Sequence, residues 1–182
     1  MPKAERTSSI DESTAAPLSS DKIVAAALAM ARASGEPPGM RELAAALSVT
    51  PGALYRHVTG QAELVELMID EVLGQVVIPD ESEPDPWQRI RSYMRSLTSI
   101  LDEHPGLDRL IAGYGDGSKA AKARQRWFLR QLRSSGLGSA ESRSAYGAIH
   151  MYWLGSRQPP RRFASSFEFG LERLIDGLRA GV

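Results

Sequence analysis

Apolar residues recur at helical spacing in two short stretches near the N-terminus, and a tight break separates them. One face of the first stretch is apolar at i, i+3, i+4 and i+7: Met40, Leu43, Ala44 and Leu47. After the break, Thr50 can cap a new helix, and Pro51 suits its first position because no backbone N–H is needed there. Leu54 and Val58 then share an inner face. The pattern predicts a helix over 41–47 and a second from Pro51 to about Val58.

The second helix points small and polar side chains outward. Its outward positions offer hydroxyl, phenol, guanidinium and imidazole groups beside small residues: Thr50, Gly52, Ala53, Tyr55, Arg56 and His57. Such groups can hold phosphates, read base edges or touch a thymine methyl in the major groove of DNA. A glycine in the first turn also lets another surface approach the backbone closely. The stretch is therefore interpreted as a helix–turn–helix with an exposed reading helix.

These helices, with a helix predicted over 20–33 and the segment 60–65, resemble a known DNA-binding domain. Over roughly residues 19–77 the chain is similar to the tetracycline-repressor (TetR) family of bacterial transcription regulators, and the string Leu54-Tyr55-Arg56-His57-Val58 is the most specific part. Gln61 stands where the family often has a lysine that contacts phosphate. The DNA-contacting residues that the resemblance and the outward face indicate are Arg41, Thr50, Pro51, Gly52, Ala53, Tyr55, Arg56, His57 and Gln61.

The resemblance implies a homodimer on a palindromic operator, most simply a repressor. Two reading helices would enter successive major grooves about 34–36 Å apart. We expect Tyr55, His57 and Thr50 to hold phosphates, and Arg56, Gly52 and Ala53 to meet the bases. Double-stranded operator DNA is thus the expected macromolecular partner.

The rest of the chain also has helical periodicity, so an all-α fold is predicted. A fourth helix is expected over about 61–77, followed by an acidic, proline-rich linker over 78–86. From Trp87 to the end at Val182 the apolar pattern predicts five further helices, which would form an effector-binding and dimerisation domain. Residues 1–18 lack apolar periodicity and are predicted to be a flexible tail, or else an arm that reaches the minor groove.

The last two predicted helices, 140–155 and 163–180, are apolar enough to need a partner. The first of them is apolar on nearly every side over 145–154, and one chain of this size has little with which to cover such a helix. A four-helix dimer interface is therefore predicted, with packing inside one chain as the alternative. Its expected residues are Tyr146, Ile149, Trp153, Phe163, Phe167, Leu171, Leu174 and Leu178.

A pocket for a small-molecule effector is also expected among the C-terminal helices. Helical cores can hold such ligands with apolar walls and a few polar groups. The candidate lining residues are Met94, Leu97, Leu101, Leu110, Tyr114, Trp127, Gln131, His150 and Met151. His150 has two interpretations, a core histidine with one hydrogen bond or a polar group inside the ligand cavity.

Two regions of the chain have an unbalanced charge that bears on DNA and ligand binding. The 182 residues have a formal net charge of zero, and residues 19–77 hold four basic side chains against seven acidic ones, which predicts weak binding to random DNA. By contrast, the predicted helix over 119–135 has six basic residues and no acid. That helix is interpreted as a solvated face whose stems cover apolar surface, or as a site that attracts an anionic ligand or a second DNA contact.

No catalytic constellation is visible in the sequence. The chain has no cysteine, and its three histidines do not have the i, i+3 or i, i+4 spacing of a metal site, so neither a metal nor a cofactor is expected. No apolar run reaches the ~20 residues of a membrane span, and no signal core is visible, so a cytoplasmic, non-membrane protein is expected. Two alternatives remain: a ligand-independent helical dimer with a DNA- or partner-binding head, and an enzyme with an appended DNA head.

Overall fold

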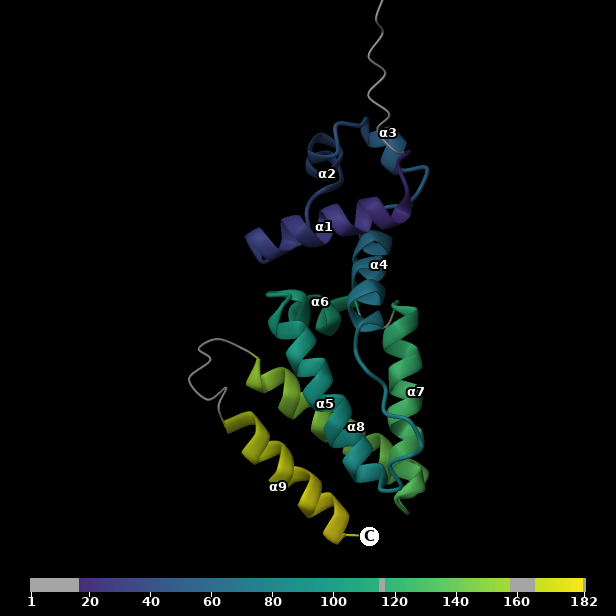
Figure 1. The fold of residues 1–182 in the computed structure, drawn as a ribbon, viewed down its shortest axis with the longest axis vertical. Coiled ribbons are helices and arrows are strands. Elements are labelled where there is room, and N and C mark those ends of the chain that lie inside the picture. Colours follow the sequence, from purple (N-terminus) through teal and green to yellow (C-terminus); the bar gives the residue numbers. More distant parts are fainter. Residues whose placement is uncertain (1–16, 115–116, 158–165, 182) are drawn as a thin grey trace, which may run out of the picture.

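The computed structural model describes residues 17–114, 117–157 and 166–181. The described residues form nine helices and no strand, which confirms the predicted all-α fold (Figure 1). The helices are α1 (Ser20–Ser34), α2 (Met40–Ala46), α3 (Pro51–Leu54), α4 (Gln61–Gly74), α5 (Pro86–Asp102), α6 (Leu107–Tyr114), α7 (Lys119–Ser134), α8 (Ser139–Ser156) and α9 (Phe167–Ala180).

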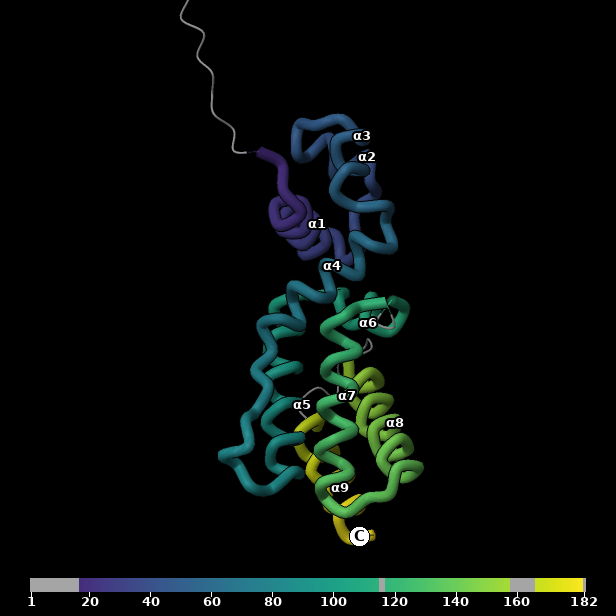
Figure 2. The backbone as a smooth tube through the Cα atoms, turned by 90° about the vertical axis from the view of Figure 1, so that its right-hand side faces the viewer, coloured from purple at the N-terminus to yellow at the C-terminus, as the bar shows by residue number. Residues whose placement is uncertain are grey.

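Helices α1 to α3 form a small head at one end of the molecule (Figures 1 and 2). The Ser19 hydroxyl accepts from the Lys22 N–H at 3.3 Å and starts α1, and Gly35 ends it in a left-handed conformation. The inner faces of the three helices share one apolar cluster: Ile23, Val24, Ala27, Ala31, Met40, Leu43, Ala44, Leu54 and Val58. Because none of these short helices is stable alone, this shared burial holds the head together.

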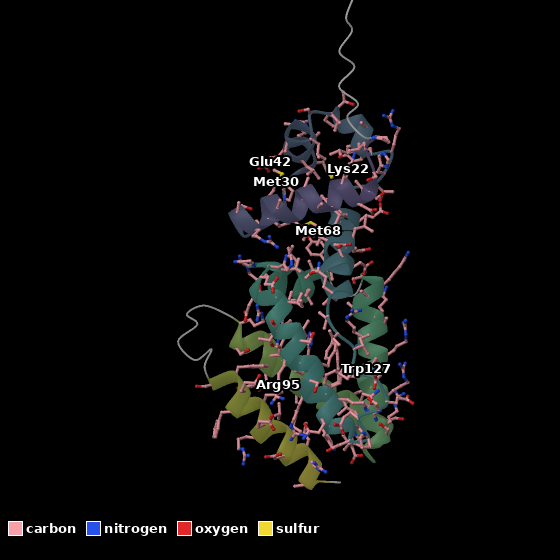
Figure 3. The ribbon with its side chains drawn as sticks, viewed as in Figure 1. Lys22, Met30, Glu42, Met68, Arg95 and Trp127 are labelled. Carbon is pink, nitrogen blue, oxygen red and sulfur yellow. The ribbon has the colours of Figure 1, made fainter. Side chains whose placement is uncertain are left out.

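Helix α4 joins the head to the rest of the chain through both of its faces. Leu64 and Met68 complete the apolar cluster of the head, whereas Val65, Ile69 and Val72 belong to a second cluster built with α5 to α9. Figure 3 shows the Met68 side chain where α4 meets α1. The two apolar cores therefore meet along α4, so a tilt of this helix must move both of them.

The second core is rich in aromatic residues and is closed by ion pairs between α5 and α9. Tyr93 lies 5.1 Å from Trp127 and 6.0 Å from Phe128, measured between ring centroids. Arg91 is buried, and its guanidinium donates to Glu172 at 2.6 Å and to Asp176 at 3.1 Å. A buried guanidinium needs such acceptors, so these pairs fix the position of α9 against α5.

The structure corrects several details of the sequence interpretation. Helix α3 ends at Leu54, although the Val58 N–H still donates to the Leu54 carbonyl at 3.0 Å and so extends the helical turn. Helix α4 ends at Gly74 instead of Val77. The sequence pattern of Glu168 and Glu172, two acids one turn apart, indicates a solvated pair, but Glu172 pairs with Arg91 and Glu168 pairs with Arg95. Residues 1–16 lie outside the described residues, as do 163–165 at the predicted start of the last helix.

Three contacts tie the head to α6 and the turn before it. Arg109 donates to the Gly35 carbonyl at 3.2 Å, and an Arg32 guanidinium nitrogen lies 3.3 Å from Nδ1 of His104. His104 is buried, and this burial lowers its pKa and favours the neutral imidazole. Gly106 has a φ of 88°, and a Cβ placed there would lie 2.4 Å from the Gly35 carbonyl oxygen.

Replacing Gly106 with alanine is therefore expected to destabilise the fold. The left-handed backbone and the clash with a backbone oxygen together cost roughly 2–3 kcal/mol of unfolding free energy. Gly113→Ala is the matched control, because it lies on α6 with open space around its Cα, and it should gain about 0.5–1 kcal/mol. Urea unfolding of both variants measures the difference, and equal midpoints would contradict the proposed close approach.

Candidate nucleic-acid interface and core cavity

The residues predicted to contact DNA lie together on the head. They belong to α2, α3, the turn after α3 and the first residue of α4, at the end of the molecule opposite the C-terminus (Figure 1). Tyr55 is 53% exposed, which is high for an aromatic side chain, and Arg56 is exposed beside it. The other exposed members are Arg41, Thr50, Pro51, Gly52 and Gln61, while Ala53 and His57 are half-buried.

Local hydrogen bonds set the orientation of the short α3. The Thr50 hydroxyl accepts from the Ala53 N–H at 3.3 Å and caps the helix, with Pro51 in its first turn. Ser48 adopts a φ of 55°, which turns the chain sharply between α2 and α3. Leu54 is fully buried and anchors the helix to the head, and Tyr55 and Arg56, in the turn that follows, are left to solvent.

Two acidic side chains near this face accept hydrogen bonds from backbone N–H groups. Glu63 accepts from the Thr59 N–H at 2.6 Å and from its hydroxyl at 2.7 Å, and these hydrogen bonds lower the pKa of the carboxyl. Glu42 accepts from the Gly39 N–H at 3.4 Å at the start of α2. Asp70, farther along α4, accepts from the Ser118 hydroxyl at 2.6 Å and from the Ala120 N–H at 2.7 Å. Glu63 thus bonds Thr59 just before α4, and Asp70 bonds the start of α7.

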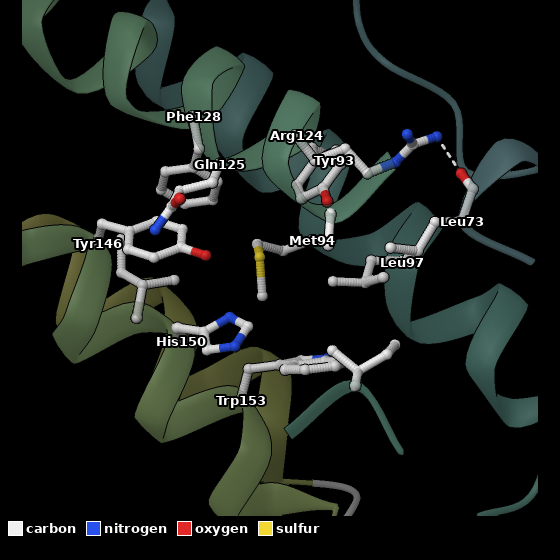
Figure 4. Close-up of a pocket in the computed structure, with 13 residues that line it drawn as sticks. Leu73, Tyr93, Met94, Leu97, Arg124, Gln125, Phe128, Tyr146, His150 and Trp153 are labelled. Atoms are coloured by element: carbon white, nitrogen blue, oxygen red, sulfur yellow. Dashed lines mark hydrogen bonds between the residues drawn. The ribbon is translucent and has the colours of Figure 1, made fainter. Parts of the chain in front are cut away.

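A cavity lies inside the second core, among α4 to α8 (Figure 4). Its volume is about 50 Å³, and a wider recess of about 250 Å³ adjoins it between α6, α7 and α8. The inner cavity is lined by Leu73, Tyr93, Met94, Leu97, Ile111, Ala121, Arg124, Gln125, Phe128, Tyr146, Ile149, His150 and Trp153. Apolar and aromatic walls with a few polar groups are typical of a site for a small molecule.

The polar groups of this cavity are mostly aromatic hydroxyls and ring nitrogens. Figure 4 shows the hydroxyls of Tyr93 and Tyr146 and the imidazole of His150 directed toward the space around the Met94 thioether. Burial lowers the pKa of His150 and raises that of Tyr93, so both groups are held neutral. The His150 ring also stacks on Tyr146, with centroids 5.4 Å apart and an interplanar angle of 16°. Of the two interpretations of His150, this placement matches the polar group in a cavity.

Three of the nine candidate effector residues line the inner cavity: Met94, Leu97 and His150. The other six lie elsewhere. Leu101, Trp127 and Gln131 are buried away from it in the core, and Leu110 is half-buried beneath α1. Tyr114 and Met151 are exposed, and Met151 points outward from α8 with 68% of its surface accessible.

Most of the residues predicted for the dimer interface pack within a single chain. Ile149, Trp153, Phe167 and Leu171 are buried in the second core, and Ile149, Trp153 and the half-buried Tyr146 also line the cavity. Leu174 and Leu178 are half-buried, and Phe163 lies outside the described residues. In a single chain these buried residues therefore offer little surface to a partner.

The cavity residues that the sequence interpretation missed had a usable signal. On α7, Trp127 and Phe128 were placed on the inner face, and Arg124 and Gln125 lie one turn before Phe128 at i−4 and i−3. Because Arg124 and Gln125 are polar and lie in a basic helix, the sequence interpretation did not place them at the cavity. On α8 the apolar residues are spread over all sides, so periodicity did not separate the face toward the cavity from the face toward solvent.

The described residues offer neither a metal site nor a membrane-spanning helix. No group of three or more His, Cys, Asp or Glu side chains there is placed to hold a metal ion. Within the same residues, no helix combines the length and the apolar character that crossing a membrane requires.

Comparison with known proteins adds sequence and structural relatives. No family profile matches the chain. An HTH-type transcriptional regulator of Saccharopolyspora erythraea is 32% identical over 140 residues, which cover 76% of this chain and 59% of that protein. The chain spans just over half of the length of the curated regulators that it matches.

Two solved structures are similar over nearly the whole chain. BioQ with its natural double-stranded DNA operator is 28% identical, with a TM-score of 0.77 over 90% of this chain and 99% of that one. The TetR family protein ActR of Streptomyces coelicolor, in complex with (S)-DNPA, is 25% identical, with a TM-score of 0.78 over 92% of this chain and 100% of that one. One relative thus holds DNA and the other holds a small molecule.

Proposed function

Because the chain belongs to the tetracycline-repressor (TetR) family of helix–turn–helix transcriptional regulators, we propose that it binds a palindromic operator as a homodimer and releases it when a small molecule fills the core cavity. The observation that supports this most is the exposed Tyr55–Arg56 pair in the turn that directly follows α3, whose Leu54 is buried in the head. A short helix and turn that present an outward cation and phenol can enter a major groove.

In this proposal Tyr55, His57 and Gln61 contact phosphates, and Arg56 reaches the bases. Arg41, on α2, would contact the DNA backbone beside the reading helix. The Thr50 hydroxyl already accepts from the Ala53 N–H, but it can still donate its proton to a phosphate oxygen. Thr50 caps α3, and Pro51, Gly52 and Ala53 form its start, where small side chains permit close approach to DNA.

Arg56→Ala is expected to weaken operator binding by about 1–3 kcal/mol and to leave binding to random DNA nearly unchanged, if Arg56 reads a base. Fluorescence anisotropy on the operator and on a shuffled duplex measures both affinities. Arg126→Ala is the control, because Arg126 is an exposed cation on α7 far from the head. An equal loss on both duplexes would assign Arg56 to phosphate.

A homodimer through α8 and α9 is supported by the outer surfaces of these helices. Met151 on α8 is 68% exposed and Phe169 on α9 is 71% exposed, the two most exposed large apolar side chains of the described residues. The outward residues near Met151 on α8 are the small Ala148 and Gly155, which allow close helix packing. The proposed interface is therefore this outer face, with Leu174 and Leu178 at its edge, instead of the buried residues first considered.

The cavity supports an effector that acts on α4. Leu73, near the end of α4, lines the cavity, while Leu64 and Met68 on the same helix pack in the head. A ligand can release DNA only by favouring a head arrangement that the operator does not accept. A coupling of ~1–3 kcal/mol would lower operator affinity about 5- to 150-fold.

The alternatives make different predictions. Membership in a family of regulators, together with the lack of a catalytic constellation in the sequence, disfavours the enzyme with an appended head. A ligand-independent dimer predicts that no small molecule shifts the thermal midpoint. A thermal-shift screen with the operator affinity measured in parallel separates that case from the proposed one.

A further inference from the structure

Resting on the proposed use of the cavity as the effector site, we propose that its effector is a planar aromatic acid whose anionic group competes with the end of α4 for Arg124. The inference deepens the proposed function by giving the chemical class of the ligand and the contact that the ligand breaks. Four observations support it: the ring geometry, the recess beside the cavity, the charge of the lining, and the bonds that Arg124 makes.

The ring geometry favours a flat guest. Phe128 meets Tyr146 edge-to-face at 5.4 Å, Tyr146 stacks on His150 at 5.4 Å, and His150 lies 5.4 Å from Trp153. These side chains form a continuous aromatic wall along α7 and α8 (Figure 4). Aromatic rings prefer offset-stacked or edge-to-face partners, and a flat ring offers both without leaving voids.

The outer recess gives the ligand additional volume and an entry path to the inner cavity. The inner cavity of about 50 Å³ is too small for a fused ring system, but it shares five lining residues with the outer recess of about 250 Å³. The shared residues are Ile111, Ala121, Gln125, Tyr146 and His150. Rotation of the Tyr146 and His150 side chains would join the two spaces, so a bicyclic ligand can enter between α6, α7 and α8.

The charge of the lining favours an anion. Among the described residues, the charged side chains that border the two spaces are Arg124 in the inner one and Lys122 in the outer one, and no acid borders either. Two buried donors at the inner cavity, Nε of Arg124 and Nε1 of Trp153, have no hydrogen-bond partner within the described residues. Asp70 interacts electrostatically with Arg124, but its carboxylate already accepts hydrogen bonds from the Ser118 hydroxyl and the Ala120 N–H. A ligand that supplies acceptors would satisfy these donors.

The bonds of Arg124 connect the ligand to the DNA-binding head. Its guanidinium donates to the Leu73 carbonyl, which also accepts from the Val76 N–H, and, at 3.4 Å, to the Val76 carbonyl, just after the end of α4. Figure 4 shows the guanidinium turned toward Leu73 at the edge of the cavity. A carboxylate in the cavity is a stronger acceptor than a carbonyl, so it draws Arg124 away and loosens the end of the helix that the head rests on.

Calorimetric titration of the full chain with naphthoate, naphthamide and decalin carboxylate tests the ligand class. Naphthoate is expected to bind roughly ten-fold or more tightly than the uncharged amide and the non-planar acid, since a charge-assisted bond contributes that much. Arg124→Gln should remove the preference of acid over amide, whereas Arg126→Gln, an exposed cation on the same helix, should keep it. Equal affinity for acid and amide in the unmodified protein, or binding of none of the three, overturns the inference.

Hydrogen exchange tests the coupling on the unmodified protein. The N–H groups of Gln75 and Val76 donate to the Val72 and Leu73 carbonyls beside the Arg124 contact. With naphthoate bound, these amides should exchange faster while the amides of α8 around His150 exchange more slowly. Slower exchange at both places would reject the competition for Arg124. Operator binding without any ligand is measured separately, so its failure would concern the proposed function and not this ligand class.

Discussion

Replacing both Met151 and Phe169 with glutamate is expected to convert a dimeric protein into a monomer. Both side chains are largely exposed on the outer faces of α8 and α9, so the substitutions leave the core of a single chain intact. In a symmetric interface each substitution occurs twice, so four carboxylates would have to lose water within an apolar contact. Sedimentation at low micromolar concentration measures the mass.

Loss of the dimer should also weaken operator binding by a factor of about 10²–10⁴, because a second linked head raises affinity by that much. Val77→Glu is the matched control: Val77 is a 65% exposed apolar residue after α4, away from α8 and α9, and this variant should stay dimeric. A double variant that remains dimeric and binds the operator at full strength would exclude the outer face of α8 and α9 as the interface.

Trp153→Ala is expected to cost about 3–5 kcal/mol of unfolding free energy, the largest stability effect of the single substitutions considered. Trp153 is fully buried, contacts His150 and Arg157, and forms one wall of the cavity. Its removal leaves a void that the surrounding aromatic rings can fill only in part. Chemical unfolding at a fixed protein concentration measures the loss, since association contributes to stability.

Tyr55→Ala is the control for the tryptophan substitution. Tyr55 is also aromatic, but 53% of its surface is exposed, so its removal should change stability by no more than about 0.5 kcal/mol. In the proposed function the same variant weakens DNA binding. A Trp153 variant as stable as the Tyr55 variant would contradict the placement of Trp153 in the core.

The head could be predicted closely from the sequence because its signals are local. Thr50 caps α3 and Pro51 begins it, Gly35 ends α1, and the apolar spacing identified Leu43 and Leu54 as inner residues. Capping and turn chemistry involve residues a few positions apart, so they are readable without the tertiary structure. The length of α3, the end of α4 and the exposure of Ala53 and His57, which are half-buried, were misjudged.

The cavity and the interface were harder to predict because they depend on which helices meet. Trp153 was expected at a partner or packed inside one chain, and it lines the cavity, whereas Met151 was expected in the cavity and is exposed. On α8 both faces are apolar, so helical periodicity gives no direction. Arg124 is polar in sequence but lies partly inside, because the carbonyls of Leu73 and Val76 compensate for its burial.

In the proposed function, the arrangement around α4 gives a physical route from ligand to DNA. The head packs on one end of this helix through Leu64 and Met68, and the other end is held by Arg124 at the cavity. Arg109 and Arg32 add contacts between α6 and the end of α1. A ligand that changes the position of α6 or the end of α4 must therefore act on the head as well.

Selection of bound duplexes from a random DNA library, followed by measurement of the stoichiometry on the enriched site, tests the central proposal most directly. The account predicts an inverted repeat whose half-sites are about 34–36 Å apart, or a multiple of a helical turn, with one chain on each half-site. Binding should fall when either half-site is scrambled. Enrichment of no sequence would contradict DNA binding by the head. Tight binding of a single chain to DNA without symmetry would contradict dimerisation through α8 and α9.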